Sequence, residues 1–390
     1  MQWILIGVVI GYLLMVIVVA NQVDGQRFVR KSRMKLAYPY NVTDTGGDVA
    51  IERVQEMSRD GLLSVLLMGT VSVPLLFSGG ALMSAVMPMP APNEGPEIAA
   101  NTALVVAAIG MIAGVFCGGL VFYRPLRERI ARLIGDRGTF NPDSAVHKTA
   151  LVLALIFLAY TLMDILLVGG VAGYAENLEE QSVGASDALA NLFIMVFVAF
   201  AGVGLTVRRP IRAVLQRLSL RLPTLEDVLW GIGTAFMCLV AIVMFSTVLV
   251  LVFSPEALEQ QGAASEQIAR ALGGSLVVAF LAAFSAAVGE EILFRGALQP
   301  VFGIFVTTAF FALLHTQYAF TPGSLAILLV GGAFAVLKER YSTTAAIIAH
   351  FTYNFVLLGS AYFLLQAEEA GLLPDGAESI ILVTSLILPF

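Results

Sequence analysis

Charged residues are the scarcest class in this chain. Asp, Glu, Lys and Arg together make up 13% of its 390 residues, whereas apolar residues make up 58% and the mean hydropathy is +0.87. A water-soluble domain usually carries about 25% charged residues. The composition therefore excludes an ordinary soluble enzyme and predicts a polytopic membrane protein, and we expect no nucleic-acid partner.

Cysteine is rare, and a basic N-terminal region is missing. The two cysteines, Cys117 and Cys238, lie in separate apolar runs, and neither has the spacing of a metal site or a disulfide framework. A secretory signal peptide begins with a positively charged region. No Lys or Arg precedes the first apolar run, 3–20, which at about 18 residues can cross a bilayer. We therefore expect a membrane helix there rather than a signal peptide.

Long apolar runs dominate the sequence. They predict an all-α, polytopic transmembrane helix bundle with about ten to eleven spans. We divide the chain into a first membrane helix with a polar segment (1–60), a group of N-terminal membrane helices (61–226) and a C-terminal membrane domain (227–390). The expected apolar segments are 3–20, 61–87, 98–123, 150–174, 188–206, 227–253, 271–298, 302–317, 323–337, 342–363 and 378–390.

Basic residues are concentrated in alternate loops. Residues 21–60, 124–148 and 207–226, with the short link after 337, carry most of the Arg and Lys, whereas the loops between them are acidic or poor in bases. The positive-inside rule places the basic loops in the cytoplasm and the N-terminus outside. Basic segments at a membrane surface bind anionic lipid headgroups. We therefore expect such contacts at the basic loops of an integral membrane protein.

Two of the basic segments resemble each other. Residues 122–133 (FYRPLRERIARL) and 207–218 (VRRPIRAVLQRL) both place Arg-Pro directly after an apolar run. One interpretation is a duplicated helix pair whose second members are short, amphipathic, basic helices. The other interpretation is a pair of independent basic flanks, and the sequence leaves both open.

Two adjacent carboxylates stand inside an apolar run. Glu290 and Glu291 lie within segment 271–298, and Arg295 follows them. Ionisable residues inside a membrane helix are costly and by default indicate function. On an α-helix Glu291 and Arg295 share a face, whereas Glu290 points about 100° away. Glu291 can then be neutralised by Arg295, which leaves Glu290 as a candidate general base. The alternative is an ion pair that only stabilises the helix.

Two histidines and an asparagine continue the pattern in later apolar runs. Phe311 and His315 are one helical turn apart, as are His350 and Asn354. A neutral His and an Asn on one helix face are two donors that could hold a developing oxyanion. Each pair alone is equally explained by hydrogen bonds between helices. With a helix break near residue 300, the rise per residue puts His315 deeper in the membrane than Glu290.

These residues make the chain resemble the CPBP family, the CAAX-prenyl-protease and bacteriocin-processing intramembrane endopeptidases, also called the Abi family. The family pattern is Glu-Glu-x-x-x-Arg, then Phe-x-x-x-His, then His-x-x-x-Asn or Asp. The matching residues are Glu290-Glu291-Ile-Leu-Phe-Arg295, Phe311-Ala-Leu-Leu-His315 and His350-Phe-Thr-Tyr-Asn354. The resemblance covers about residues 270–365 and implies a CPBP-like protease domain in 227–390.

The resemblance implies a role for each matching residue. Glu290 would activate a water molecule for attack on a peptide carbonyl, and His315 would help to hold that water. Glu291 would be oriented by Arg295, and the two polar residues of the last motif would stabilise the oxyanion. The substrate would be a membrane-associated protein or peptide, and we expect the protein in a bacterial cytoplasmic membrane.

Three alternatives remain open. Glu290, His315 and His350 could be three zinc ligands with an open fourth position, although we expect a glutamate-type enzyme without a cofactor. The protein could instead be a non-catalytic scaffold or a bacteriocin-immunity-type protein that acts by binding. It could also be a transporter, but the inverted repeats and broken helix pairs typical of transporters are not evident.

Overall fold

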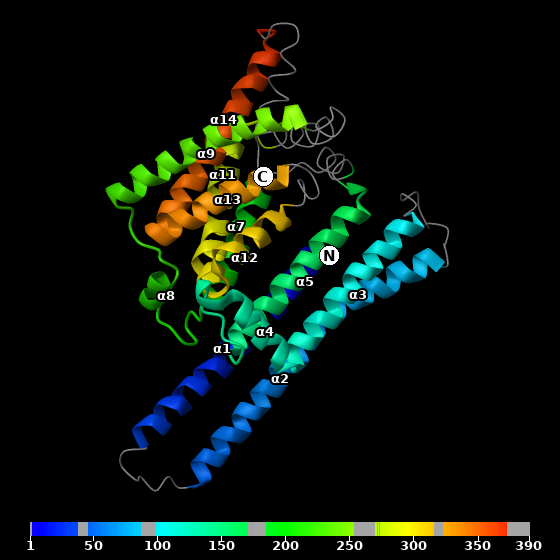
Figure 1. Cartoon of the computed structure of the whole chain (residues 1–390), viewed down its shortest axis with the longest axis vertical. Helices are drawn as coiled ribbons and strands as arrows, with labels where there is room; N and C mark the ends of the chain where they lie inside the picture. Colours follow the sequence, from blue (N-terminus) through cyan, green and yellow to red (C-terminus); the bar gives the residue numbers. More distant parts are fainter. Residues whose placement is uncertain are drawn as a thin grey trace. The chain divides into compact units, whose positions relative to one another are not determined.

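The chain is helical throughout the part that the structure describes. The computed structural model describes residues 2–37, 46–86, 99–170, 185–252, 274–315 and 323–372, with residues 173, 270 and 272 singly. Within these residues the chain forms helices joined by turns and contains no β-strand (Figure 1). The predicted all-α class is therefore confirmed.

Eight helices in the described residues are long and apolar enough to cross a membrane, against about ten to eleven predicted. The predicted segments 271–298 and 302–317 form one helical stretch, Leu276–Leu314. Segment 323–337 forms an 18-residue helix that ends in three charged residues and is not among the eight. Segment 378–390 lies outside the described residues. The chain is thus a polytopic integral membrane protein, and its described residues hold fewer helices of spanning length than the number predicted for the whole chain.

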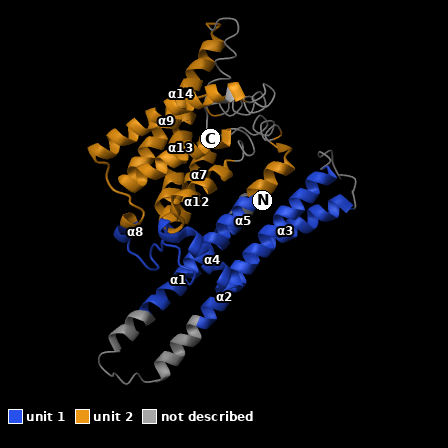
Figure 2. Cartoon of the chain, in the orientation of Figure 1, with its two compact units in different colours: residues 1–160, 200–214 blue, residues 161–199, 215–390 orange. Residues whose placement is uncertain are grey.

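The chain divides into two compact units (Figure 2). Unit 1 comprises residues 1–160 and 200–214, and unit 2 comprises residues 161–199 and 215–390. Helices extend into both sides of the predicted polar segment 21–60, so that most of it is not a loop. Unit 1 contains α1 (Gln2–Ala37), α2 (Gly46–Val86), α3 (Ala100–Phe122), α4 (Arg124–Ile134), the 3-10 turn η1 (Gly135–Arg137) and most of α5 (Ala145–Leu167).

Helix α2 packs against α1 and α3 in unit 1. Polar contacts also join α1 to residues 200–214 of the same unit: Asn21 Nδ2 donates to the carbonyl of Ala201 at 3.0 Å, and Asn21 Oδ1 accepts from Arg208 Nε at 2.7 Å. The carboxylate of Asp24 accepts the backbone N–H of Ala145 at 2.7 Å, at the start of α5. Buried polar groups are tolerated when they are hydrogen-bonded in this way. The apolar core includes Val16, Val23, Leu63, Leu67, Leu120 and Val152.

Both predicted basic helices are present, as α4 and as α8 (Ile211–Arg217). Arg127, in α4, donates through Nη1 to the carbonyl of Leu120 at 2.6 Å, and Arg209, before α8, donates to the carbonyl of Val203 at 2.5 Å. The last carbonyls of a helix have no partner within the helix, so these arginines satisfy the ends of the preceding membrane helices. The two segments therefore share a capping arrangement as well as a sequence pattern.

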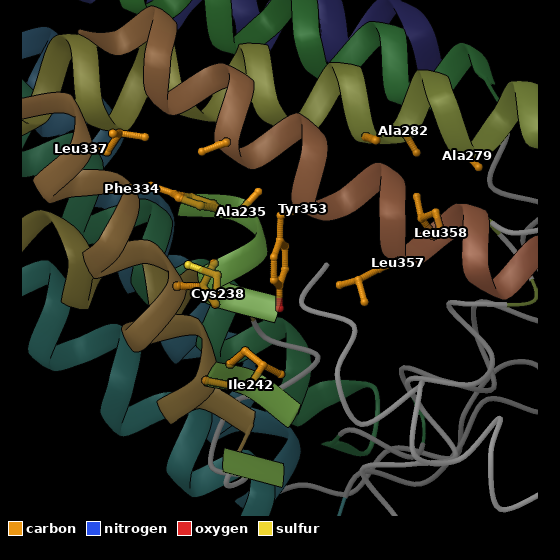
Figure 3. Packing of buried hydrophobic residues seen from close by; sticks show 14 of the residues in the cluster. Ala235, Cys238, Ile242, Ala279, Ala282, Phe334, Leu337, Tyr353, Leu357 and Leu358 are labelled. Atoms are coloured by element: carbon orange, nitrogen blue, oxygen red, sulfur yellow. The ribbon is translucent and has the colours of Figure 1, made fainter. Parts of the chain in front are cut away.

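Unit 2 holds the C-terminal helices. Helix α14 packs against α9 and α11, and α13 packs against α12 (Figure 1). Alanines at these contacts let the helices approach closely, as is typical of membrane bundles. Figure 3 shows buried residues of this core, among them Ala279, Ala282, Phe334, Leu337, Tyr353, Leu357 and Leu358. The elements are α7 (Ala185–Gly202) up to residue 199, α9 (Leu225–Val252), α11 (Leu276–Glu290), the π-helix η2 (Glu291–Leu298), α12 (Gln299–Leu314), α13 (Gly323–Arg340) and α14 (Thr343–Glu369).

The stretch from α11 to α12 bends sharply at Gly303. This residue has φ 80° and ψ 166°, a conformation that is essentially restricted to glycine. Phe294 before the bend contacts Phe311 after it, with ring centroids 5.1 Å apart. The two arms therefore form an antiparallel hairpin. The break predicted near residue 300 lies instead at Gly303, and Pro300 continues the first arm.

Candidate functional site

The two adjacent carboxylates lie where α11 passes into a π-helix. Residues Glu291–Leu298 are π-helical, whereas the sequence predicted a regular α-helix. The N–H of Gln299 accordingly donates to the carbonyl of Phe294, five residues earlier. Pro300 follows at once; it has no N–H to donate, and its ring clashes with a carbonyl four residues earlier in an α-helix. The proline favours this departure from α geometry, and such departures occur frequently at functional sites.

Glu291 is the centre of a buried charge network. Its side chain is 0% exposed; its Oε2 lies 3.2 Å from Arg295 Nε, and its Oε1 lies 3.0 Å from His350 Nδ1. A buried charge is tolerated when it is paired and hydrogen-bonded; Oε1 of Glu291 shares a hydrogen bond with His350, and Oε2 faces Arg295 as an ion pair. The predicted Glu291–Arg295 pair is confirmed. The contact with His350 was not predicted, because it joins residues 59 positions apart.

Arg295 is held by α13 and α12 as well as by Glu291. Its Nη2 donates to the carbonyl of Gly331 at 3.1 Å, and its Cζ lies 4.6 Å from the centroid of the Phe311 ring. A Cβ atom on Gly331 would lie 3.1 Å from Phe311 Cδ1 and 3.3 Å from Arg295 Nη2, so glycine allows this close approach. A guanidinium stacks favourably on an aromatic face. The Phe of the second motif therefore supports the Arg of the first.

Each histidine uses one ring nitrogen within the protein. His315 Nδ1 lies 2.8 Å from the carbonyl oxygen of Phe311. A carbonyl oxygen only accepts, so Nδ1 carries the proton, and Nε2 of a neutral His315 is an acceptor. His350 Nδ1 faces Glu291, and its ring stacks on Phe334 with centroids 5.2 Å apart. Among the described residues, Nε2 of neither ring has a hydrogen-bond partner, so it can bind another group.

Five motif atoms are buried without a hydrogen-bond partner among the described residues: Oε2 of Glu290, Oε2 of Glu291, Nε and Nη1 of Arg295, and Oδ1 of Asn354. Glu291 Oε2 and Arg295 Nε still face each other as an ion pair, whereas Glu290 Oε2 and Asn354 Oδ1 have no charged partner there. Asn354 is 1% exposed, and Glu290 is partly buried. An unsatisfied buried polar group costs about 1–3 kcal/mol, so it is a natural place for a water molecule or a substrate to bind. Asn354 lies one turn after His350 on α14, as predicted.

The hairpin brings the carboxylates and His315 together. Glu290 is thirteen positions before Gly303, and His315 is twelve positions after it. Antiparallel arms therefore place both residues at a similar depth, and His315 lies within electrostatic range of Glu290, Arg295 and His350. The greater depth predicted for His315 is wrong, because the chain bends at Gly303 rather than near residue 300.

Sequence reasoning missed two buried polar residues that join helices of unit 2. Gln299 is 1% exposed, and its Nε2 donates to the carbonyl of Ala335 at 3.0 Å and to Glu339 at 2.9 Å. Ser342 caps the N-terminus of α14 and donates to Asp227 at 2.7 Å. The sequence carried a signal for each of them. Gln299 is a lone amide in an apolar run, and Ser342 stands directly before a helix.

A zinc site would require Glu290, His315 and His350 to be grouped around one position. In the part of the chain that is described, no group of three or more His, Cys, Asp or Glu side chains is placed to hold a metal ion. Glu290, His315 and His350 therefore do not form a metal-binding cluster as they stand. A metal-bound histidine usually donates its other ring N–H to a carboxylate or carbonyl, and both histidines have such a contact.

Comparison with known families assigns the segment that carries this network. The family described as type II CAAX prenyl endopeptidase Rce1-like matches residues 272–356. This C-terminal segment belongs to the CAAX protease family. The CAAX protease segment contains every motif residue from Glu290 to Asn354, whereas residues 1–271 lie outside it. No curated protein and no solved structure matches the chain.

The charge network of the CAAX protease segment makes a testable prediction. Arg295→Met should lower the free energy of unfolding by about 3–5 kcal/mol, because Glu291 then stays buried without its guanidinium. The double variant Glu291→Gln/Arg295→Met should recover part of this loss, because the uncompensated charge is gone. Denaturant unfolding of the purified protein in detergent measures both. Losses that simply add in the double variant would contradict the coupling.

Proposed function

We propose that this chain is an intramembrane endopeptidase that hydrolyses peptide bonds of a membrane-associated protein or peptide. The proposal is carried by Oε2 of Glu290, a buried carboxylate oxygen without a hydrogen-bond partner among the described residues. The neighbouring carboxylate, Glu291, is paired at both oxygens. One carboxylate is thus committed to structure while the other keeps an oxygen for chemistry. The membership of residues 272–356 in the CAAX protease family supports the reaction class.

In this proposal Glu290 is the general base and His315 positions the water. A base must lie within hydrogen-bond reach of the proton that it removes. One hydrogen of the water points to Glu290 Oε2, and the other points to Nε2 of His315, which is an acceptor because Nδ1 faces the carbonyl of Phe311. The water oxygen attacks the peptide carbonyl as its proton passes to Glu290.

The developing oxyanion is assigned to His350 and Asn354. Because the Nδ1 proton of His350 points to Glu291 at 3.0 Å, Nε2 can donate only when the ring is doubly protonated. In that form Nδ1 donates to the carboxylate of Glu291. The proposal therefore replaces the neutral His350 expected from the sequence. The amide of Asn354 is the second donor. When the tetrahedral intermediate collapses, Glu290 returns the proton to the leaving amine.

The decisive variant is Glu290→Gln, which keeps the shape of the side chain but removes the base. We expect cleavage to fall at least about a hundredfold. Protein termini are quantified in membranes that carry the wild type or the variant at equal abundance. Glu226→Gln, which changes an exposed carboxylate at the start of α9, is the matched control and should cleave normally. Unchanged cleavage by Glu290→Gln would refute the mechanism, and a biological role that survives it would favour the scaffold alternative.

We also propose that the reaction requires no metal ion. Glu290 then activates water directly, and the histidines act through their hydrogen bonds. Treatment of the purified protein with a zinc chelator, followed by dialysis, should leave the cleavage rate unchanged. A loss of cleavage that added zinc restores would instead make Glu290, His315 and His350 zinc ligands.

The basic helices support a further proposal about orientation. We propose that α4 and α8 face the cytoplasm of a bacterial cell and contact anionic lipid headgroups. Arg129, which is exposed on α4, and Ser186, which is exposed at the start of α7, should lie on opposite sides. A membrane-impermeant thiol reagent added to intact cells should label Ser186→Cys but not Arg129→Cys. The reverse pattern would overturn the orientation; the native cysteines are buried.

A further inference from the structure

Arg217, the last residue of α8, contacts the π-helix from outside the CAAX protease segment. Its Nη1 donates to the carbonyl of Gly296 at 3.1 Å, and its Nη2 lies 3.5 Å from the carbonyl of Ala297. The guanidinium is partly buried. Both carbonyls belong to the π-helix that carries Glu291 and Arg295. An arginine that the sequence marked only as a topology signal therefore binds the backbone of the candidate site.

The carbonyl of Gly296 lacks the donor that an α-helix would supply. In an α-helix it would accept the N–H of residue 300, but residue 300 is a proline and has no N–H. The proline ring also displaces the carbonyl four residues before it, which is that of Gly296. A buried carbonyl without a partner is costly. Arg217 supplies the hydrogen bond that Pro300 cannot give.

The residues after Arg217 join the π-helix to the start of α14. A Cβ atom on Gly296 would lie 3.1 Å from the carbonyl oxygen of Leu218, so the two backbones are in close contact. The same carbonyl of Leu218 accepts from Thr343 Oγ1 at 2.7 Å, and the carbonyl of Ser219 accepts from Thr343 N at 3.1 Å. One short segment thus binds the helix of Glu291 and the helix of His350.

We propose that Arg217 is a positioning residue that holds the π-helical conformation of residues 291–298 and thereby keeps Glu291 against His350. The proposal rests on the proposed function for its catalytic consequence. A shift of this segment to α-helical register, by one residue, would turn Glu291 by about 100° away from His350. The imidazolium assigned to the oxyanion would then lose its carboxylate. Arg217 touches neither water nor substrate in this scheme.

The test compares Arg217→Ala with Arg212→Ala. Arg212 lies on the same helix, is exposed, and has no hydrogen bond or ion pair with the rest of the described chain, so its removal controls for charge. We expect Arg217→Ala to lower the rate of cleavage about tenfold or more, as a small misplacement of catalytic groups does. Arg217→Ala should also speed amide hydrogen exchange in peptides covering residues 291–302 of the full-length protein. Arg212→Ala should change neither quantity.

A second variant separates positioning from general destabilisation. Pro300→Ala restores an N–H four residues after Gly296, which competes with Arg217 for this carbonyl and favours α-helical register, so this variant alone should also lower cleavage. In that background the loss caused by Arg217→Ala should shrink to less than about threefold, a coupling that independent sites would not show. Cleavage and amide exchange of Arg217→Lys, which keeps the charge and a single donor nitrogen, are measured in parallel in case Arg217→Ala inserts poorly into the membrane.

The outcomes distinguish this inference from the proposed function. Amide exchange needs no substrate, so it tests the role of Arg217 even if Glu290→Gln leaves cleavage unchanged. Faster exchange over residues 291–302 that Pro300→Ala reverses supports the inference. Equal losses with and without Pro300→Ala, or exchange like that of Arg212→Ala, would overturn it.

Discussion

A buried carboxylate that has to be neutralised is the constraint on which the candidate site depends. Glu291 is fully buried, and its oxygens contact a guanidinium on its own helix and an imidazole on α14. Arg295 in turn binds the carbonyl of Gly331 on α13. Moving α13 or α14 away would take a hydrogen bond from a buried charged group, at a cost of about 1–3 kcal/mol or more. The network therefore fixes the positions of His350 and Asn354 while leaving Glu290 outside it.

The backbone geometry around this charge comes from three residues with unusual backbone chemistry. Pro300 removes a hydrogen-bond donor and favours the π-helix that begins at Glu291. Gly303 adopts a conformation restricted to glycine and folds the second arm back, so that Phe311 and His315 return to the level of the carboxylates. Gly331 leaves room for the guanidinium of Arg295. These local features of the sequence thus determine the hairpin, and the hairpin places the candidate catalytic residues next to each other.

Part of this could be predicted from the sequence, and the reasons are specific. The membrane helices follow from apolar length, and Glu290, Glu291 and the two histidines stand out as polar residues in apolar runs. The pairing of Glu291 with Arg295 follows from helical spacing. The contact of Glu291 with His350 could not be predicted, because no local rule joins residues so far apart. The bend was misplaced because proline is the stronger helix breaker in sequence, whereas Gly303 is one of 36 glycines.

The central claim is that Glu291 is neutralised within the protein while Glu290 keeps an oxygen for water. The most direct test is an experimental density map of the full chain in a lipid nanodisc, at a resolution that shows ordered water. We expect a π-helix over residues 291–298, Glu291 between Arg295 and His350, and a water molecule hydrogen-bonded to Glu290. A regular α-helix with Glu291 turned away from His350, or a protein side chain paired with Glu290, would contradict the claim.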